Sequence, residues 1–236
     1  MANTYFKFKQ FTIQQDQSGM KVGTDGVLLG AWANINNSEN ILDIGTGTGL
    51  IAIMCAQRNN SAKIDAIEID TDTYNQAVYN INECKWSKRI SIYNISLQNF
   101  STKKIYDCII SNPPFFNNST KNQTKKKCLA RHTDSLKFSD IISFSINHLS
   151  PKGKLCIILP PIEAENFIDE ALNKNLFLNK IIRIKPNKSK NPKRIMFELS
   201  FIEKDIQDDF LTIETDTRHL YTDDYQNLTK DFYLKM

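Results

Sequence analysis

The segment Ile41-Leu42-Asp43-Ile44-Gly45-Thr46-Gly47-Thr48-Gly49 decides the fold of this chain. It begins as an apolar run that predicts a buried strand. It ends in three glycines at alternate positions, at the start of a predicted helix over residues 49–58. Alternate glycines allow the tight dihedral angles of a turn and let a ligand lie on the backbone N–H groups at the start of a helix. The segment therefore predicts a strand, a ligand-binding loop and a helix in succession.

The spacing of these glycines separates two kinds of nucleotide site. A dinucleotide-binding loop follows G-x-G-x-x-G/A, whereas Leu50 stands here where the last Gly or Ala would be expected. The G-x-G-x-G spacing resembles motif I of methyltransferases that use S-adenosylmethionine (SAM), a cofactor without a pyrophosphate. The resemblance implies that Asp43, Gly45, Gly47 and Gly49 contribute to a SAM site. The other interpretation is a structural turn that binds nothing.

Polar residues follow the next two predicted strands. Glu68 lies in the strand predicted over residues 64–69, about 20 residues beyond the glycines, where an acid is expected to accept hydrogen bonds from ribose hydroxyls. Asp70 is the neighbouring candidate, but it should lie further from the pocket, so Glu68 is preferred. Ser96 follows the strand predicted over residues 90–95, where methyltransferases of this type more commonly have Asp to bind the adenine amine. The other interpretation of Glu68 is a solvent-facing acid.

The tetrapeptide Asn112-Pro113-Pro114-Phe115 follows another predicted strand. Its prolines fix the backbone and remove two N–H donors, which leaves the Asn112 amide oxygen and the Pro113 carbonyl as acceptors for an amino group. Phe115 is expected to stack on the ring that carries this amino group. The tetrapeptide resembles motif IV of amino-methyltransferases that act on adenine N6, guanine N2 or a glutamine amide. We therefore interpret Asn112, Pro113, Pro114 and Phe115 as catalytic, the alternative being a structural proline loop.

Predicted strands and helices alternate along the chain. Strands are predicted over residues 41–44, 64–69, 90–95, 106–111, 155–159, 176–185 and 195–203, and helices over residues 49–58, 72–84, 134–149 and 162–175. Alternation with continuous apolar strands indicates an α/β fold with a parallel sheet covered on both faces. The last two strands have no helix between them and must pair antiparallel. With motif I, this pattern resembles the Rossmann-like class I methyltransferase fold, a mostly parallel seven-stranded sheet with an antiparallel last strand.

Length and composition favour one globular domain over residues 1–236. Within it we expect an N-terminal extension and cofactor-covering segment over residues 1–38, a core over residues 39–203 and an acidic C-terminal extension over residues 204–236. A content of 41% hydrophobic and 24% charged residues argues against disorder and coiled coil.

Other classes of protein are disfavoured by what the sequence lacks. No stretch reaches the ~18–20 apolar residues of a membrane span, and the N-terminus has no apolar signal-peptide core. The five cysteines are at least 20 residues apart and form no CxxC pair. These features predict a reduced, cytoplasmic protein without a membrane, a metal or an obligate protein partner.

The net charge of +4 is unevenly distributed. The bases are in excess over residues 1–202, and two runs that read as loops concentrate them, at residues 125–127 and 185–194. Basic loops indicate a polyanionic partner such as RNA, although a solvated lysine-rich surface would look the same. The residues predicted to bind RNA on this ground are Lys125, Lys126, Lys127, Lys188, Lys190, Lys193 and Arg194.

Longer segments resemble the bacterial tRNA1(Val) adenine-N6 methyltransferase family. They are residues 6–11, 20–32, 130–136 and 231–234. The resemblance implies methyl transfer from SAM to N6 of the adenosine at position 37 of the tRNA, beside the anticodon.

The same resemblance extends to individual residues. It implies that Lys21 and Thr24 belong to a segment that closes over SAM, although Thr24 or Asp25 could equally cap a helix that runs to Trp32. It also suggests that Arg131 and His132 hold a phosphate or the target nucleotide.

Two other functions stay open at this point. A guanine-N2 rRNA methyltransferase uses a similar Asn-Pro-Pro-Phe sequence, and a catalytically silent subunit could bind SAM or RNA. An intact Asn112 and an intact glycine loop argue against the silent subunit, because a binding scaffold needs no such pair.

Overall fold

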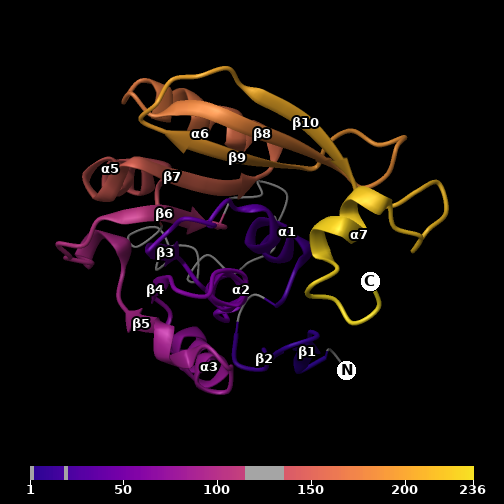
Figure 1. The fold of residues 1–236 in the computed structure, drawn as a ribbon, viewed down its shortest axis with the longest axis horizontal. Coiled ribbons are helices and arrows are strands. Elements are labelled where there is room, and N and C mark those ends of the chain that lie inside the picture. The colour runs from indigo at the N-terminus through magenta and orange to yellow at the C-terminus, as the bar shows by residue number, and fades with distance from the viewer. Residues whose placement is uncertain (1–2, 19–20, 115–135) are drawn as a thin grey trace, which may run out of the picture.

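A computed structural model describes residues 3–18, 21–114 and 136–236 of the chain. Its main feature is a central sheet with helices on both sides (Figure 1). The strands of this sheet are β3 (Asn40–Ile44), β4 (Lys63–Glu68), β5 (Ile90–Asn94), β6 (Tyr106–Ser111), β7 (Leu149–Leu159), β8 (Phe177–Lys185), β9 (Arg194–Ser200) and β10 (Gln207–Thr212). Their order across the sheet is β10-β8-β9-β7-β6-β3-β4-β5. Only β9 runs against its neighbours, since it pairs antiparallel with both β7 and β8.

The seven strands expected from the sequence are present as β3 to β9, so the mostly parallel Rossmann-like sheet with its antiparallel strand is confirmed. β10 is an eighth strand that the sequence analysis did not predict. It pairs parallel with β8 at the edge of the sheet, and within it only Leu211 is buried. Because a single buried residue gives no apolar pattern, the strand could not be recognised before its pairing was known.

Two layers of helices cover the sheet. The helices are α1 (Thr24–Trp32), α2 (Leu50–Arg58), α3 (Thr71–Asn82), α5 (Phe138–His148), α6 (Pro161–Leu172) and α7 (Asp223–Thr229), with single turns η1 (Ser87–Arg89) and η2 (Leu97–Asn99). The core splits accordingly, because α1 and α2 pack on one face of the sheet and α5 and α6 on the other. A small sheet of β1 (Tyr5–Lys7) and β2 (Thr12–Gln14) lies near α3.

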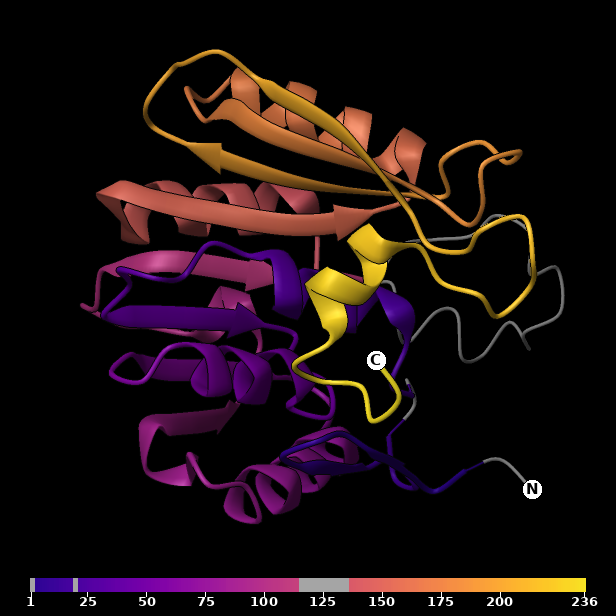
Figure 2. The same cartoon turned by 45° about the vertical axis from the view of Figure 1, so that its right-hand side comes forward.

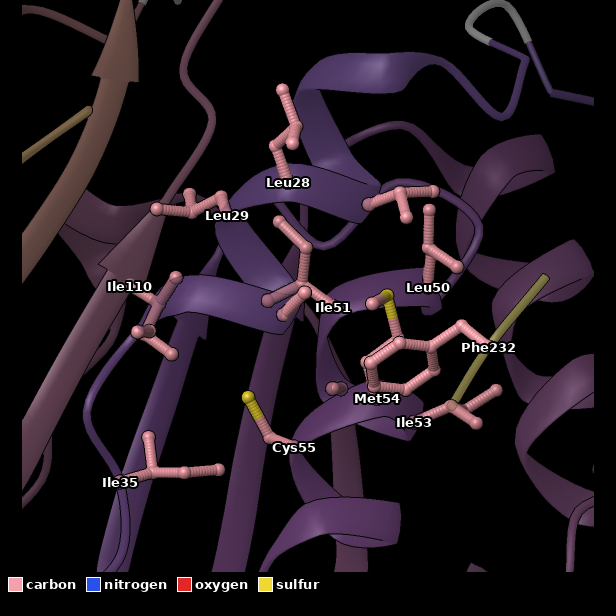
Figure 3. Close-up of a cluster of buried hydrophobic side chains, with 14 of the residues drawn as sticks. Leu28, Leu29, Ile35, Leu50, Ile51, Ile53, Met54, Cys55, Ile110 and Phe232 are labelled. Carbon is pink, nitrogen blue, oxygen red and sulfur yellow. The ribbon is translucent and has the colours of Figure 1, made fainter. Parts of the chain in front are cut away.

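Helices α1 and α2 pack closely because α1 has glycines four residues apart. A Cβ atom at Gly26 would lie 3.2 Å from the Leu50 side chain, and one at Gly30 would lie 2.8 Å from Sδ of Met54. Figure 3 shows the resulting cluster, in which Phe232 from the C-terminal segment reaches the same helices. Gly26 and Gly30 therefore permit the close packing of α1 on α2.

The two ends of the chain lie against each other. The Lys9 backbone N–H donates to the carbonyl of Phe232 at 2.8 Å, and the ring of Phe8 stacks on Tyr233. The Lys9 ammonium also donates to the backbone carbonyl of Lys230 at 2.5 Å. These contacts join two of the segments that resemble the methyltransferase family in sequence.

All strands except β9 point their carboxyl ends to the same edge of the sheet. The connection between β8 and β9 and the segment over residues 213–222 leave the sheet at that edge too, on the right in Figure 2. Open α/β sheets bind ligands at the carboxyl ends of their strands. The functional site is therefore expected there.

Candidate active site

The three glycines after β3 form an open loop. Gly45, Gly47 and Gly49 have φ angles of +69°, +58° and +83°, which lie in the left-handed region that side chains disfavour. A Cβ atom added at Gly45 or Gly47 would meet no atom of the described residues within 4 Å. The loop thus presents bare backbone to open space in front of α2, as a ligand that lies on the backbone requires.

Asp43 holds this loop from beneath. Its Oδ2 accepts hydrogen bonds from the Thr46 hydroxyl at 2.6 Å and from the Ala52 backbone N–H at 3.1 Å, and the residue is only 1% exposed. Its Oδ1 has no hydrogen-bond partner within the described parts of the chain. Burial raises the pKa of Asp43 from 3.8 to about 7. The hydrogen bonds from Thr46 and Ala52 lower this pKa in part, and the negative charge of Glu68 raises it slightly. The contacts tie β3, the loop and α2 together.

Glu68 ends β4 and faces the glycine loop. Its Oε2 accepts a hydrogen bond from the Gly47 backbone N–H at 2.9 Å, and its Oε1 accepts one from the Asp70 N–H at 3.0 Å. The Asp70 side chain instead caps α3 by accepting from the Thr73 N–H at 2.9 Å. Of the two candidate acids, Glu68 is the one directed at the loop.

Ser96 lies beyond the next strand. β4 and β5 are also joined by a side chain at their carboxyl ends, because the Asn94 side-chain amide donates to the Glu68 carbonyl at 2.9 Å. Ser96 is partly buried and precedes η2, where its side chain makes no capping hydrogen bond to the described backbone. Ser96 is thus two residues past Asn94, the β5 partner of Glu68.

Asn112 leaves the sheet beside the glycine loop. β3 and β6 pair in parallel with Ile44 opposite Ser111, and the Ser111 hydroxyl donates to the Ile44 carbonyl at 2.8 Å. The next residues along these strands, Gly45 and Asn112, therefore start adjacent connections. Asn112 is partly exposed, while the following Pro113 is buried.

The sequence analysis missed an amide network that fastens the N-terminal segment onto this site. The Asn80 amide donates to the carbonyls of Gln14 and Thr48, both at 2.9 Å, and its oxygen accepts from the Gln14 N–H at 2.8 Å. Gln76, one turn earlier on α3, accepts from the Gln17 N–H at 3.0 Å. The only signal in the sequence was two amide side chains at i and i+4 in a predicted helix. Lys21 lies in this segment, exposed, with its ammonium 3.3 Å from the Asn3 carbonyl.

The start of α1 meets the basic connection between β8 and β9. The residue that caps α1 is Gly23, so the expectation that Thr24 or Asp25 caps it was wrong. Asp25 instead accepts a hydrogen bond from Nε of Arg194 at 2.6 Å. Thr24, expected at the cofactor, and Arg194, expected at RNA, line one cavity with Lys193. Lys188, Lys190 and Lys193 are exposed in the same connection.

Other predicted site residues lie outside the described parts of the chain. They are Phe115, Lys125, Lys126, Lys127, Arg131 and His132. Among residues 3–18, 21–114 and 136–236, no group of acidic, histidine and cysteine side chains could hold a metal ion. No helix of those residues is long and apolar enough to cross a membrane.

Comparison with known proteins places the chain among methyltransferases. Residues 20–180 match the family described as methyltransferase small domain. A protein of Trichodesmium erythraeum is 46% identical over the full length of both chains, and one of Flavobacterium psychrophilum is 45% identical over 98% of this chain and 100% of its own. Both relatives carry the name tRNA1(Val) (adenine(37)-N6)-methyltransferase.

Solved structures show the same fold at low identity. A predicted O-methyltransferase of Agrobacterium tumefaciens superposes with a TM-score of 0.68, at 17% identity, over 88% of this chain and 96% of its own. The TYW2 protein of Pyrococcus horikoshii, in complex with MeSAdo, has a TM-score of 0.56 at 16% identity over 83% of this chain and 69% of its own. The chain thus shares its fold with these two solved proteins.

Proposed function

Since this chain belongs to the tRNA1(Val) (adenine(37)-N6)-methyltransferase family, we propose that it transfers the methyl group of SAM to N6 of adenosine 37 in tRNA1(Val). One observation of this structure supports the proposal independently of the family. The pairing of Ile44 with Ser111 makes Gly45 and Asn112 leave the sheet side by side. A methyl donor bound on the glycine loop and an amine bound at Asn112 would therefore lie next to each other, as in-line methyl transfer requires.

The residues around the glycine loop fit SAM. The open space before Gly45 and Gly47 accommodates a ligand on the backbone, and Glu68 can accept hydrogen bonds from ribose hydroxyls with its remaining lone pairs. Ser96 is assigned to the adenine amine, and Lys21 and Thr24 to the segment that covers the cofactor. Asp43 acts through the loop that it supports. Bound SAM supplies a methyl group on a positively charged sulfur, which leaves as a neutral thioether.

The acceptor side is assigned to the tetrapeptide after β6. The lone pair of the N6 amine is delocalised into the adenine ring and is a poor nucleophile. The Asn112 side-chain oxygen and the Pro113 carbonyl accept hydrogen bonds from its two protons, which favours a pyramidal nitrogen with its lone pair aimed at the methyl group. These bonds strengthen in the transition state, and the methylated nitrogen, which then carries a positive charge, loses one of its two protons to water. Pro114 restricts the backbone, and Phe115 is assigned to stack on an adenine that no longer stacks on its neighbouring bases in the RNA.

The tRNA is assigned to the basic connection between β8 and β9, at the same edge of the sheet, and to five basic residues outside the described parts of the chain. Lys188 and Lys190 are exposed between β8 and β9, close in sequence to Lys193 and Arg194. With Lys125, Lys126, Lys127, Arg131 and His132, they would contact the phosphates of the anticodon arm. We expect the protein to act as a single methyltransferase domain in the cytoplasm, without an obligate protein partner.

One experiment tests the proposal against its alternatives. The protein is incubated with labelled SAM and either total tRNA or rRNA, and the RNA is digested to nucleosides. N6-methyladenosine from tRNA is the expected product. N2-methylguanosine from rRNA would replace the proposal by a guanine-N2 rRNA methyltransferase, and the absence of label would leave a silent binding subunit.

A further inference from the structure

A cavity of about 190 Å³ lies at the carboxyl edge of the sheet, apart from Asn112 and the glycine loop. It is open to solvent on one side and is lined by residues from the start of α1, the connection between β8 and β9, and the segment after β10. Figure 2 shows these segments near that edge. Four of its lining residues are apolar, namely Leu28, Ile184, Pro186 and Ile213, and the other four are Thr24, Asp25, Lys193 and Arg194. The proposed methyl transfer gives none of the four apolar residues a role.

The rim of the cavity is charged, and two hydrogen bonds orient the guanidinium of Arg194 there. Nε of Arg194 donates to Asp25 at 2.6 Å, and Nη1 of Arg194 donates to the Lys193 carbonyl at 2.7 Å. The side chains of Arg194 and Asp25 keep 29% and 25% of their area exposed, so the guanidinium is held in place with one part facing solvent. Lys193 is exposed beside it. A guanidinium with a neighbouring ammonium suits a phosphate group.

The size of the cavity limits what it can hold. An apolar protein cavity of about 150 Å³ holds one benzene, whereas sites for drug-sized ligands begin at about 300 Å³. The 190 Å³ cavity therefore fits one planar ring system and is too small for SAM. Apolar walls with a cationic rim match a nucleobase inside and its phosphate outside.

The cavity is too far from Asn112 to hold the methylated base. β8 is the third strand from β6 in the order β8-β9-β7-β6, which at a typical strand spacing corresponds to about 14 Å. A base held at Asn112 and a base held between α1 and β8 must belong to different nucleotides.

We propose that this cavity receives the base of a nucleotide next to adenosine 37, position 36 or 38, with a phosphate bound by Lys193 and the exposed part of Arg194. The inference rests on the proposed function, because it requires an RNA substrate whose target base lies at Asn112. Holding a flanking base apart from adenosine 37 removes the stacking partner of the target and favours its entry into the active site.

The test fills the cavity. Ile213→Trp occupies the space for the base, and Leu172→Trp is the control, since Leu172 is 52% exposed at the far end of α6. We expect Ile213→Trp to raise KM for tRNA about 10-fold, the loss typical of one base contact, with kcat within about twofold of the wild type. The Kd for SAM and the Tm should match those of the control, which shows that the fold and the cofactor site are intact.

A modified substrate identifies the nucleotide. tRNA with an abasic residue at position 36 or 38 should bind the wild type about 10-fold more weakly at one of the two positions, and Ile213→Trp should add no further loss at that position. Lys193→Ala should weaken tRNA binding more than Lys204→Ala, an exposed lysine near the opposite edge of the sheet.

Two results would overturn the inference while the proposed function stands. One is a normal KM for Ile213→Trp on intact tRNA. The other is full additivity at both positions, in which the abasic residue weakens tRNA binding by Ile213→Trp as much as it weakens tRNA binding by the wild type. Failure of the proposed function is a different result, because the wild type would then transfer no methyl group to intact tRNA.

Discussion

The backbone N–H of Gly47 donates a hydrogen bond to Oε2 of Glu68 at 2.9 Å. This bond joins the loop after β3 to the acid that ends β4, so the two parts of the proposed SAM site form one unit. Glu68 also accepts from the Asp70 N–H at 3.0 Å, which fixes the orientation of its carboxylate. The acid thereby shapes the loop and faces the space where the ribose is expected.

Removing the charge of Glu68 should weaken SAM binding. A hydrogen bond to a charged group contributes about 1.5–3 kcal/mol, so Glu68→Gln is expected to raise the Kd for SAM about 10-fold or more, as measured by calorimetry. Asp72→Asn is the matched control, because Asp72 is an exposed acid in the first turn of α3. Equal affinities for Glu68→Gln and the control would remove Glu68 from the cofactor site.

Asn112→Ala should abolish turnover while SAM still binds. The variant lacks the amide oxygen that accepts a hydrogen bond from the target amine, an interaction that strengthens in the transition state. We expect kcat below about a tenth of the wild-type value with an unchanged Kd for SAM. Asn82→Ala, at the exposed end of α3, should behave as the wild type. Retention of more than a tenth of the rate by Asn112→Ala would contradict the role of that amide.

The buried carboxyl of Asp43 should make the stability of the protein depend on pH. Burial raises its pKa to about 7 from 3.8, so between these values the folded protein holds a proton that the unfolded chain has lost. The free energy of unfolding of the wild type should therefore fall relative to that of Asp43→Asn as pH rises from about 4 to 7, by a few kcal/mol, and level off above that range. Urea unfolding of both proteins across this range measures the difference. A difference that does not vary with pH would show that Asp43 titrates normally.

A larger side chain at Gly30 should destabilise the contact between α1 and α2. A Cβ atom there would come within 2.8 Å of Sδ of Met54, which is fully buried. Overpacking of this kind costs about 1–3 kcal/mol, so Gly30→Val should lower the Tm by several degrees. Gly23→Ser is the control, because Gly23 has an extended backbone, the nearest atom to its Cβ would be 3.8 Å away, and Ser is a favoured N-cap residue. Equal Tm values for the two variants would contradict the close packing at Gly30.

The fold followed from local patterns where strands were continuously apolar. The strand expected over residues 106–111 has those bounds as β6, and those around it differ by a few residues at most at their carboxyl ends. β10 escaped prediction because its one buried residue, Leu211, becomes recognisable only when the strand lies beside β8. β7 begins at Leu149, six residues before the expected start, since polar residues at its amino end gave no strand pattern.

Some residues of the candidate site could be assigned from the sequence and others could not. Gly45, Gly47 and Glu68 could be assigned from spacing, because the loop and the strand end that hold them are local features of the chain. The pairing of Asp25 with Arg194 could not be assigned, since 169 positions separate the two residues and no local pattern connects them. The same holds for Asn80, whose amide joins β2 to the glycine loop across 66 and 32 positions.

By itself, the sequence determined that this chain forms a mostly parallel α/β sheet with a glycine loop, an acid at the end of the next strand and an Asn-Pro-Pro sequence after β6. Strand periodicity and glycine spacing act over a few residues, so they can be recognised without coordinates. Only the tertiary structure decided that Gly45 and Asn112 start adjacent connections, that Asp43 is buried beneath the loop and that α1 and the basic connection line one cavity. Register, burial and cavities arise when distant segments pack, and no local pattern encodes them.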